Sequence, residues 1–489
     1  MAHTQNTSSE PVQGHRHRDI GLFLGPIAAL TMLLVPVPDG LQPAAWHTAA
    51  VGVLMAIWWA SEALPVGATA LVPLVLFPLL GVFGIKEAAA PFANPLIYLF
   101  LGGFFIALAI QRWNVHLRMA LVILSVMTGS PKALIAGFMI TTAFLSMWVS
   151  NTATTIMMLP VAVAVIALMG EEGTLQDNAF ARTLMLSIAY SASVGGLATL
   201  VGTAPNALLA AFISDNYGTA IGFARWMMLG LPVSMVLLGV IWFFITRRPF
   251  HEAHAKIDEV AHHLTQKRAN LGPLRSPEKR VIGVFVLTVF LWVFRPLAAS
   301  QLGLPGLTDS GIAIFGALLM FALPADWKNR EFLLNWSWAR QAPWDVLLLF
   351  GGGLSLAKAI HETGLAVWMG EALMGLGALP VGVLILGIVG MVIFFTELTS
   401  NTATTIAFLP VIASIAQVSG LDPLQLAIPA ALAASCAFML PAATPPNAIV
   451  FGSGHVTIPN MVRAGFVLNL AGMILITVAA LILVPLVFG

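Results

Sequence analysis

The chain has 489 residues, of which 59% are hydrophobic and only 9% are charged, and its mean hydropathy is +0.92. A soluble globular protein carries roughly 25% charged residues, so this composition cannot cover a surface that faces water and indicates a protein of the lipid bilayer. The net charge of +1 argues against a nucleic-acid partner. The single cysteine, Cys436, excludes an intramolecular disulfide and any metal or iron–sulfur site built from several cysteines.

A polar tail, residues 1–19, opens the chain. Because no small-residue cleavage site follows it, we expect a retained first helix rather than a signal peptide. A membrane-spanning helix needs about 20 apolar residues. Apolar runs fall at about 20–38, 46–64, 66–84, 95–112, 132–168, 182–212, 226–246, 279–299, 309–324, 344–361, 380–418, 424–453 and 461–487.

Two of these runs, 132–168 and 380–418, are nearly twice the length of one span, and a polar hexapeptide interrupts each midway. The simplest geometry is a re-entrant hairpin with its polar tip at mid-depth, where irregular backbone is tolerated only if protein buries it or it lines a watery cavity. The sequence therefore predicts an all-α polytopic membrane protein with about eleven spans plus two re-entrant hairpins.

The basic residues support this count. If the N-terminus is cytoplasmic and the sides alternate, all but four of the 22 Lys and Arg residues fall in cytoplasmic segments, as the positive-inside rule expects. The four others are Lys86, Arg225, Arg295 and Lys358. We therefore predict an inner-membrane protein with a cytoplasmic tail (1–19), a first half (20–246), a cytoplasmic linker (247–278) and a second half (279–489) that ends in the periplasm.

The two halves carry the same signature. The segment from Ser150 to Val161, SNTATTIMMLPV, matches the segment from Ser400 to Val411, SNTATTIAFLPV, at ten of twelve positions. A glycine cluster precedes each copy (Leu101–Gly103 and Phe350–Gly353), and a Thr-x-Pro-Asn element follows each (Gly202–Asn206 and Ala443–Asn447). Three elements in one order indicate an internal duplication. The span count gives the two hairpins opposite orientations, so the repeats are inverted, as in many secondary transporters.

Both polar elements can bind ions. Proline breaks the helices at 182–212 and 424–453. Each break leaves a helix N-terminus whose free N–H groups suit carboxylate oxygens, while freed carbonyls and hydroxyl and Asn oxygens suit a small alkali cation. An isolated membrane threonine more often bonds to its own helix or packs against a neighbour, but a duplicated twelve-residue segment at a hairpin tip favours function.

Two Ser-Asn-Thr motifs, each followed by a Thr-x-Pro-Asn element, resemble the divalent anion:sodium symporter family, the INDY-like dicarboxylate transporters. The resemblance extends from Trp58-Trp-Ala-Ser-Glu-Ala-Leu-Pro65 to Phe451-Gly-Ser-Gly454. It implies a homodimer in which a scaffold domain forms the interface and a transport domain with both hairpins moves as an elevator. It also implies C4-dicarboxylates (succinate, malate or fumarate) as substrates, sodium ions as co-transported ions, and no organic cofactor.

The same resemblance implies the site residues. The first sodium site would use Ser146, Ser150, Asn151 and Gly202, and the second would use Thr396, Thr399, Asn401 and Ala443. The anion would contact Asn151, Thr152 and Thr203 from one half and Asn401, Thr402, Thr444 and Pro445 from the other. Two facing half-sites suit a ligand with a carboxylate at each end. Since neither motif contains Lys or Arg, bound cations must supply the compensating charge.

Other functions remain alternatives. On the same fold, an exchanger or a proton-coupled carrier would differ in its response to a sodium gradient. A membrane enzyme would need a catalytic constellation, and the sequence contains no H-E-x-x-H and no G-x-S-x-G motif. A channel fits inverted repeats with hairpin tips less well than alternating access does.

Several further polar residues need an interpretation. Glu62 and Glu397 lie at or near membrane depth, where a functional and a structural role are equally plausible. Lys358 and Glu362 have the spacing of an i, i+4 ion pair. His251, His254, His262 and His263 fit a solvated linker better than a metal site. Residues 326–343, with Trp336 and Trp338, look like an interfacial stretch.

Overall fold

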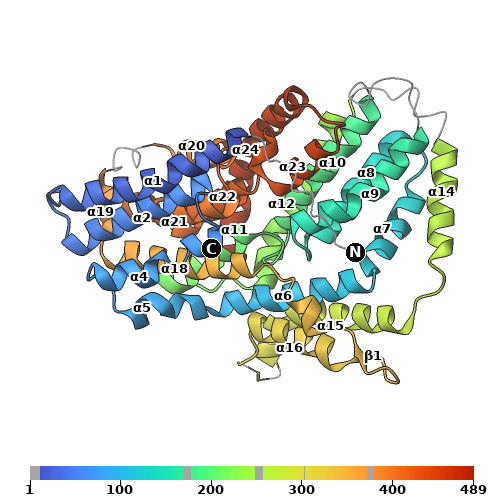
Figure 1. Cartoon of the computed structure of the whole chain (residues 1–489), viewed down its shortest axis with the longest axis horizontal. Helices are drawn as coiled ribbons and strands as arrows, with labels where there is room; N and C mark the ends of the chain where they lie inside the picture. Colours follow the sequence, from blue (N-terminus) through green and yellow to red (C-terminus); the bar gives the residue numbers. More distant parts are fainter. Residues whose placement is uncertain (1–11, 170–177, 248–256, 302, 305, 373–378) are drawn as a thin grey trace, which may run out of the picture. The chain divides into compact units, whose positions relative to one another are not determined.

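The computed structural model describes residues 12–169, 178–247, 257–301, 303–304, 306–372 and 379–489. Within these residues nearly every element is a helix (Figure 1), as predicted. The chain divides into two compact units: unit 1 comprises Met1–Phe92 and Trp344–Trp368, and unit 2 comprises Ala93–Pro343 and Met369–Gly489. Each unit takes segments from both predicted halves.

Unit 1 contains the first helices and one helix from the second half. Its elements are α1 (Val12–Leu34), α2 (Pro43–Ser61), α3 (Val66–Thr69), α4 (Val72–Leu79), α5 (Ile85–Ala89) and α18 (Trp344–Glu362). The 3₁₀ turn η1 (Ala90–Ala93) and α19 (Leu365–Ala372) cross the boundary between the units. The first helix thus begins within the segment that the sequence assigned to a polar tail.

The second glycine cluster of the sequence explains how α18 packs. A side chain at Gly352 would overlap the carbonyl oxygen of Ala70, directly after α3, and one at Gly351 would overlap the ring of Phe92. Only glycine lets the backbones of α18 and α3 approach this closely. The first cluster acts in the same way in unit 2, where a side chain at Gly102 would meet the backbone of Ala313.

Unit 1 contains two ion pairs that bear on the sequence analysis. One involves Glu62, whose role was left open, and the other is the predicted pair of Lys358 and Glu362. Glu62 follows the last turn of α2 with φ 50°, and its carboxylate lies 3.3 Å from an Arg18 nitrogen. Both side chains are substantially exposed, so Glu62 has a surface ion pair there rather than a buried site. The i, i+4 pair is confirmed, with Lys358 Nζ 3.9 Å from a Glu362 oxygen.

Unit 2 contains both hairpins and both broken helices. Its elements from the first half are α6 (Pro95–Arg112), α7 (Val115–Val126), α8 (Pro131–Ser146), α9 (Asn151–Met169), α10 (Ala179–Gly196), α11 (Ala204–Tyr217), α12 (Phe223–Ile245) and α14 (Ile257–Asn270). From the second half come α15 (Ser276–Gln301), α16 (Asp309–Ala322), α17 (Trp336–Ala339), α20 (Val381–Thr396), α21 (Asn401–Val418), α22 (Pro423–Ala434), η3 (Pro441–Ala443), α23 (Pro445–Gly452) and α24 (Ile458–Phe488).

The two hairpins are α8–α9 and α20–α21, and each turns within four residues at its polar tip. Capping explains where the second arm of each begins. Ser400 Oγ accepts a hydrogen bond from Ala403 N at the start of α21, and Ser150 Oγ accepts one from Ala153 N in α9. Figure 1 shows α8, α9 and α10 side by side, and contacts join α10 to both arms.

Helices from the two halves interleave in unit 2. The helix after the first break, α11, packs against α21 and α22 of the second half, and the helix after the second break, α23, packs against α9 and α10 of the first. The helix after each break therefore packs against the second arm of the other half's hairpin. This arrangement brings the two copies of the repeated motif into one region of the fold.

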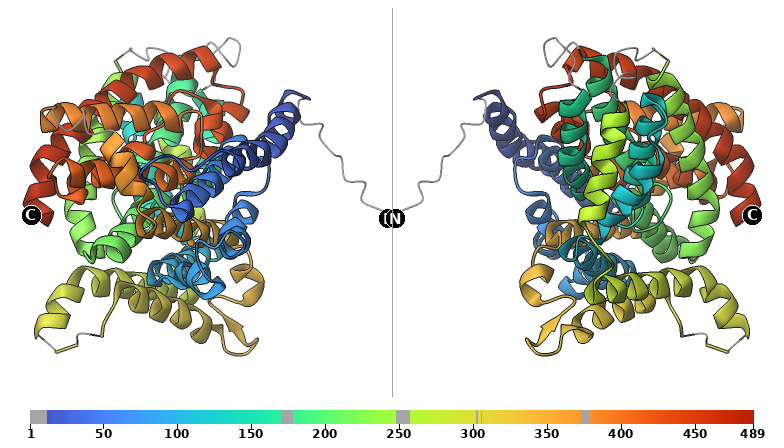
Figure 2. Two further views of the ribbon diagram at one scale, coloured as in Figure 1. Left: turned by 90° about the vertical axis from the view of Figure 1, so that its left-hand side faces the viewer. Right: turned by 90° about the vertical axis from the view of Figure 1, so that its right-hand side faces the viewer.

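The linker and the Trp-rich stretch contain more structure than the sequence suggested. Within 247–278, α14 buries Val260 and Leu264 and lies beside α7 and α9, as the right-hand view of Figure 2 shows. His251 and His254 lie outside the described residues, and no group of His, Cys, Asp or Glu in the described part could hold a metal ion. In the described residues, two short antiparallel strands, β1 (Pro324–Asp326) and β2 (Glu331–Phe332), depart from the all-α prediction.

Seven helices in the described part of the chain are long and apolar enough to cross a membrane. They lie at Pro43–Ser61, Ile85–Arg112, Asn151–Met169, Phe223–Ile245, Ser276–Ala299, Asn401–Val418 and Ile458–Phe488. Six shorter apolar helices add to these, among them the first arm of each hairpin. On α12, Met228, Met235 and Val236 are largely exposed, which suits a lipid surface and not water.

Candidate functional site

The tip of the first hairpin gathers oxygen atoms around a single proton. Ser146 Oγ lies 2.6 Å from Asn151 Oδ1 and 2.7 Å from the carbonyl oxygen of Ala192 on α10. A serine hydroxyl has one proton, so it can donate to only one of these acceptors at a time. Three oxygens with one proton between them form a ligand set that suits a hard cation, which would accept all three lone pairs at once.

The second hairpin repeats this arrangement. Thr396 Oγ1 lies 2.9 Å from Asn401 Oδ1 and 3.0 Å from the carbonyl oxygen of Ala434 on α22. Thr396 and Ser146 are both fully buried, while Asn151 and Asn401 are half-buried. The duplication that the sequence revealed therefore extends to atoms, with a hydroxyl, an Asn oxygen and a backbone carbonyl in each copy.

The asparagine of each Thr-x-Pro-Asn element stabilises the non-helical backbone at its helix break. Asn206 Nδ2 donates to the carbonyls of Gly196 (3.1 Å) and Thr199 (2.8 Å), at the end of α10 and in the turn that follows it. Asn447 Nδ2 donates in the same way to Ala437 O (3.1 Å) and Leu440 O (3.0 Å). Both asparagines are fully buried, and within the described residues neither Oδ1 atom has a hydrogen-bond partner. Each break thus presents one further free acceptor.

The first break also depends on two glycines that face each other. A side chain at Gly202 would overlap the backbone of Gly196, and one at Gly196 would approach Asn151 Oδ1 and Gly202 O to 2.9 Å. The carbonyl oxygen of Gly202 and the amide oxygen of Asn151 therefore both lie on the face of Gly196 where a side chain would be. This contact brings the start of α9 and the start of α11 together, as the predicted first site requires.

Glu397 organises the second break. Its Oε1 accepts hydrogen bonds from Phe438 N (2.7 Å) and Met439 N (2.9 Å), and its Oε2 accepts one from Leu440 N (3.0 Å). A fourth donor, Asn469 Nδ2 on α24, lies 2.7 Å from Oε1. The side chain is 4% exposed. All four partners donate, so this glutamate has a structural role: it holds the backbone of 438–440 in place where α22 has ended.

Direct contacts join the two breaks. Thr203 Oγ1 of the first break lies 3.3 Å from Ser435 Oγ of the second. Tyr190 on α10 donates to Phe438 O (2.9 Å), and the two rings make an edge contact with centroids 5.1 Å apart. Thr203 and its counterpart Thr444 are nearly buried. The polar groups assigned to the anion by resemblance thus lie at a junction between the halves.

The hydroxyls of the Ser-Asn-Thr motifs are more accessible. Thr152 and Thr402 are half-buried, in the first turn of α9 and α21 respectively, where N–H groups have no partner within the helix. Thr444 accepts a hydrogen bond from Asn447 N at the start of α23, and Pro445 is exposed. Thr152 and Thr402 can therefore offer hydroxyl and N–H donors to an anion without first breaking a buried network, whereas Pro445 has no N–H group to donate.

Not every predicted residue contacts the oxygen clusters through its side chain. Ser150 caps α9, and Thr399 Oγ1 lies 2.6 Å from Thr404 Oγ1 and 3.2 Å from Phe395 O. Ala443 is buried in η3 and can offer only its carbonyl. Conversely, the carbonyls of Ala192 and Ala434 lie in the clusters although no sequence signal marks them.

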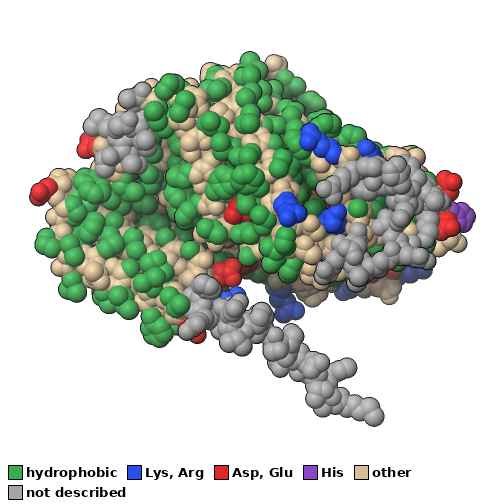
Figure 3. Space-filling model, turned by 90° about the horizontal axis from the view of Figure 1, so that it is seen from above, with side chains coloured by type: hydrophobic (Ala, Val, Ile, Leu, Met, Phe, Trp, Pro, Cys, Tyr) green, Lys and Arg blue, Asp and Glu red, His purple; other side chains and the backbone are tan. Residues whose placement is uncertain are grey.

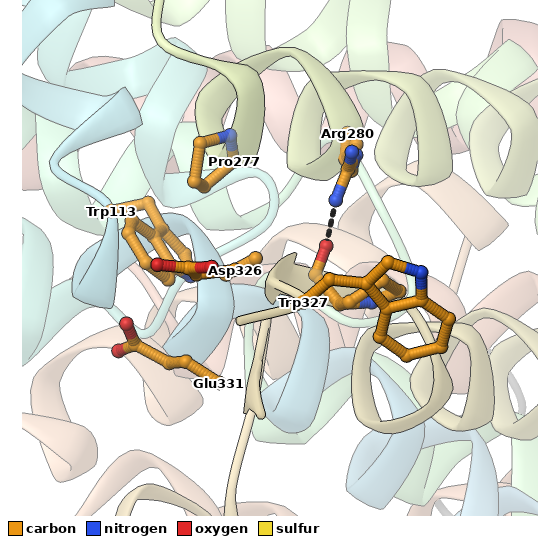
Figure 4. Close-up of a pocket in the computed structure, with 8 residues that line it drawn as sticks. Trp113, Pro277, Arg280, Asp326, Trp327 and Glu331 are labelled. Carbon is orange, nitrogen blue, oxygen red and sulfur yellow. Dashed lines mark hydrogen bonds between the residues drawn. The ribbon is translucent and has the colours of Figure 1, made fainter. Parts of the chain in front are cut away.

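A separate surface pocket of about 420 Å³ lies away from the hairpin tips, between the end of α6, the start of α15 and the β1–β2 strands (Figure 4). In it, Arg280 donates to the carbonyl of Pro324, while Asp326 and Glu331 contribute carboxylates. The N–H of Lys328 hydrogen-bonds Asp326 and holds the pKa of this exposed carboxyl below its usual range. Two carboxylates and one cation make this pocket a poor site for an anion.

The comparison with known proteins decides the family. The chain matches the transmembrane region of the sodium:sulfate symporters over residues 17–488. The chain belongs to this family. It is 40% identical over 479 residues to the sodium-dependent dicarboxylate transporter SdcS of Staphylococcus saprophyticus, an alignment that covers 96% of this chain and 92% of the relative. The identity to SdcS of Staphylococcus aureus (strain MRSA252) is also 40%, with the same coverage.

Two solved structures share the fold. MtrF of Neisseria gonorrhoeae, described as one of a class of antimetabolite efflux pumps, has a TM-score of 0.55 at 14% identity and covers 97% of this chain and 95% of its own. The YdaH transporter of Alcanivorax borkumensis has a TM-score of 0.53 at 12% identity and covers 98% of both chains. At such low identity these structures show the fold alone.

These comparisons confirm the predicted family, the helical polytopic membrane fold and the prediction of a transporter rather than an enzyme. The roles of the individual site residues stay predictions. Reasoning from the sequence missed the carbonyls of Ala192 and Ala434. It also left Glu397 undecided, although a glutamate directly before a polar hairpin tip was the one signal that pointed to it.

Proposed function

We propose that this protein imports a C4-dicarboxylate such as succinate, malate or fumarate together with sodium ions by alternating access. The observation that carries the proposal is the pair of equivalent oxygen clusters at the hairpin tips, centred on Ser146 and Thr396. The names of the relatives, sodium-dependent dicarboxylate transporters at 40% identity, support a dicarboxylate as the substrate and sodium as the coupling ion.

Sodium would bind where a hydroxyl now shares its proton. Turning the Ser146 proton away would leave Ser146 Oγ, Asn151 Oδ1 and Ala192 O as three acceptors around one cation, with the carbonyl of Gly202 close by. In the second half the matching atoms are Thr396 Oγ1, Asn401 Oδ1 and Ala434 O, followed by the carbonyl of Ala443. Small alkali cations prefer such hard oxygen ligands.

The anion would bind between the halves. Thr152 and Thr402 begin the second arms of the two hairpins, and Thr203 and Thr444 begin the helices after the two breaks. Equivalent donors from each half suit a carboxylate at each end of one small molecule. Since the motifs contain no Lys or Arg, two bound sodium ions would balance the dianion, which makes anion affinity depend on sodium.

Transport requires that this site face each side of the membrane in turn. We propose an elevator movement of the hairpins and breaks in a homodimer, in an inner membrane with the N-terminus and the 247–278 linker in the cytoplasm and Gly489 in the periplasm. The bias of Lys and Arg residues supports this orientation. The interleaved packing of α11 and α23 supports movement of both half-sites as one body.

Purified protein in proteoliposomes tests the function. An inward sodium gradient should drive accumulation of labelled succinate above its equilibrium level, and an equal potassium gradient should not. Uptake that is the same in both salts would refute sodium coupling. Uptake that then requires internal dicarboxylate would indicate an exchanger, and uptake that follows a pH gradient would indicate a proton-coupled carrier.

A further inference from the structure

Three arginines surround one cavity in unit 2. The cavity has a volume of about 410 Å³ and lies between the beginning of α10, the end of α12 and the beginning of α24. Its lining comprises Ala179, Arg182, Thr183, Leu186, Phe244, Ile245, Arg247, Asn460, Arg463, Ala464, Val467 and Leu468. α10 contributes Arg182, α24 contributes Arg463, and Arg247 follows the end of α12; no acidic side chain is among these lining residues.

The charges of these arginines are not balanced within the described residues. The side chains of Arg182 and Arg463 take part in no hydrogen bond or ion pair there, and Arg182 is half-buried. Arg247 lies over the rings of Phe243 and Phe244, with its guanidinium carbon 4.8 Å and 4.3 Å from their centroids. Arg247 and Arg463 are exposed, so the three guanidinium groups favour an anion through their combined positive charge and their paired N–H donors and not through burial.

The rest of the cavity is apolar. Leu186, Phe244, Ile245, Val467 and Leu468 line it. The surface continues in the same way, because Phe243 is 54% exposed and Phe466 45% exposed. Figure 3 looks from above onto the side where α10 and α24 lie in Figure 1, and it shows Lys and Arg side chains gathered within a hydrophobic surface. A ligand that fits both parts has an anionic head and an apolar body.

The position along the helices agrees with a membrane boundary. α12 and α24 are apolar enough to span a bilayer, and the cavity lies at the last turn of one and the first turns of the other. Basic pockets at this level between transmembrane helices are suited to anionic lipid head groups, whose phosphate accepts paired hydrogen bonds from guanidinium groups. Dicarboxylates and inorganic phosphate share the charge but lack the acyl chains.

We propose that this cavity is a binding site for an anionic phospholipid. The phosphodiester accepts hydrogen bonds from Arg182, Arg247 and Arg463, and the acyl chains lie along the exposed apolar faces of α12 and α24. The site is separate from the hairpin tips and does not depend on which anion the protein carries.

Native mass spectrometry of the detergent-solubilised protein tests the proposal. Titration with phosphatidylglycerol should show a bound lipid at concentrations at which phosphatidylcholine does not bind. One basic residue near an anionic lipid surface corresponds to about a fivefold change in affinity, so Arg463→Gln should weaken phosphatidylglycerol binding about fivefold. The combined variant Arg182→Gln, Arg247→Gln, Arg463→Gln should weaken it about a hundredfold.

The matched control removes three exposed positive charges elsewhere in unit 2, with Arg275→Gln, Lys279→Gln and Lys328→Gln. This control should keep the wild-type affinity for phosphatidylglycerol. Equal binding of the two lipids by the wild type, or equal losses in the control and the combined variant, would overturn the proposal. If inorganic phosphate or succinate displaced the lipid at equal concentration, the cavity would be a site for free anions instead. If the combined variant does not fold, the single variant Arg463→Gln, at an exposed position, tests the proposal, and a wild-type affinity for phosphatidylglycerol in it would overturn the proposal.

Discussion

Replacing Glu397 by glutamine should disorder the second break while leaving the side chain almost the same size. The carboxylate accepts four hydrogen bonds, three at Oε1 and one, from Leu440 N, at Oε2. A glutamine can place its oxygen where Oε1 is and keep three of them. Its NH₂ group then faces Leu440 N across 3.0 Å, so two donors meet and the fourth hydrogen bond is lost.

The size of the effect follows from this geometry. A hydrogen bond to a charged group contributes about 1.5–3 kcal/mol, and the three remaining bonds also lose their charge assistance. A loss of about 1.5–3 kcal/mol lowers the population of the ordered break by roughly ten- to a hundredfold relative to disordered forms. Since a ligand must bind the ordered form, the sodium concentration for half-maximal uptake should rise by up to that factor.

Two measurements on Glu397→Gln check this prediction: sodium dependence of succinate uptake in proteoliposomes, and thermal unfolding in detergent. The control is Glu371→Gln, at an exposed glutamate of α19, which should change stability by less than about 0.5 kcal/mol and leave uptake unchanged.

A wild-type sodium dependence in Glu397→Gln would show that the hydrogen bonds to residues 438–440 do not govern the site. A lower melting temperature with unchanged sodium dependence would show that Glu397 contributes only to the overall stability of the fold, and it would refute the link to the cation site.

Three further predictions concern the tips and the orientation. Ser146→Ala removes one oxygen of the first cluster and should raise the sodium concentration for half-maximal uptake by roughly tenfold or more. By reciprocal coupling it should also weaken succinate affinity at low sodium but not at saturating sodium. Thr152→Val keeps the shape of the side chain and should weaken succinate binding by about 1.5–3 kcal/mol, measured as KM at saturating sodium. A reporter enzyme fused after Gly489 should be active only in the periplasm.

Matched controls separate these effects from general damage. Ser187→Ala removes a buried hydroxyl of α10 that bonds only within its own helix, and it should leave sodium dependence unchanged. Thr154→Val removes a buried hydroxyl without a hydrogen-bond partner in the described residues, and it should not change KM. If Ser146→Ala lost the same succinate affinity at low and at saturating sodium, Ser146 would not belong to the cation site. If Thr152→Val kept the wild-type KM, Thr152 would not belong to the anion site. Activity of the Gly489 fusion in the cytoplasm would refute the span count.

The sequence alone was enough to predict the membrane class, the hairpins and the family. Apolar length, a polar interruption and proline are local properties, so they act wherever the segment lies in the fold. The hairpin predicted at 132–168 is α8–α9, and the one at 380–418 is α20–α21. The repeated Ser-Asn-Thr motif marked the tips for the same reason, since a duplicated run of polar residues between apolar segments can be recognised from the amino-acid sequence alone.

Only the tertiary structure decided which atoms meet at those tips. The carbonyls of Ala192 and Ala434 enter the oxygen clusters because α10 and α22 pass beside the hairpins, and a backbone carbonyl leaves no mark on residue type. Glu397 was ambiguous for a related reason. A buried carboxylate can bind a cation or accept N–H groups, and the choice depends on the distant residues 438–440 and Asn469, which the fold brings to it.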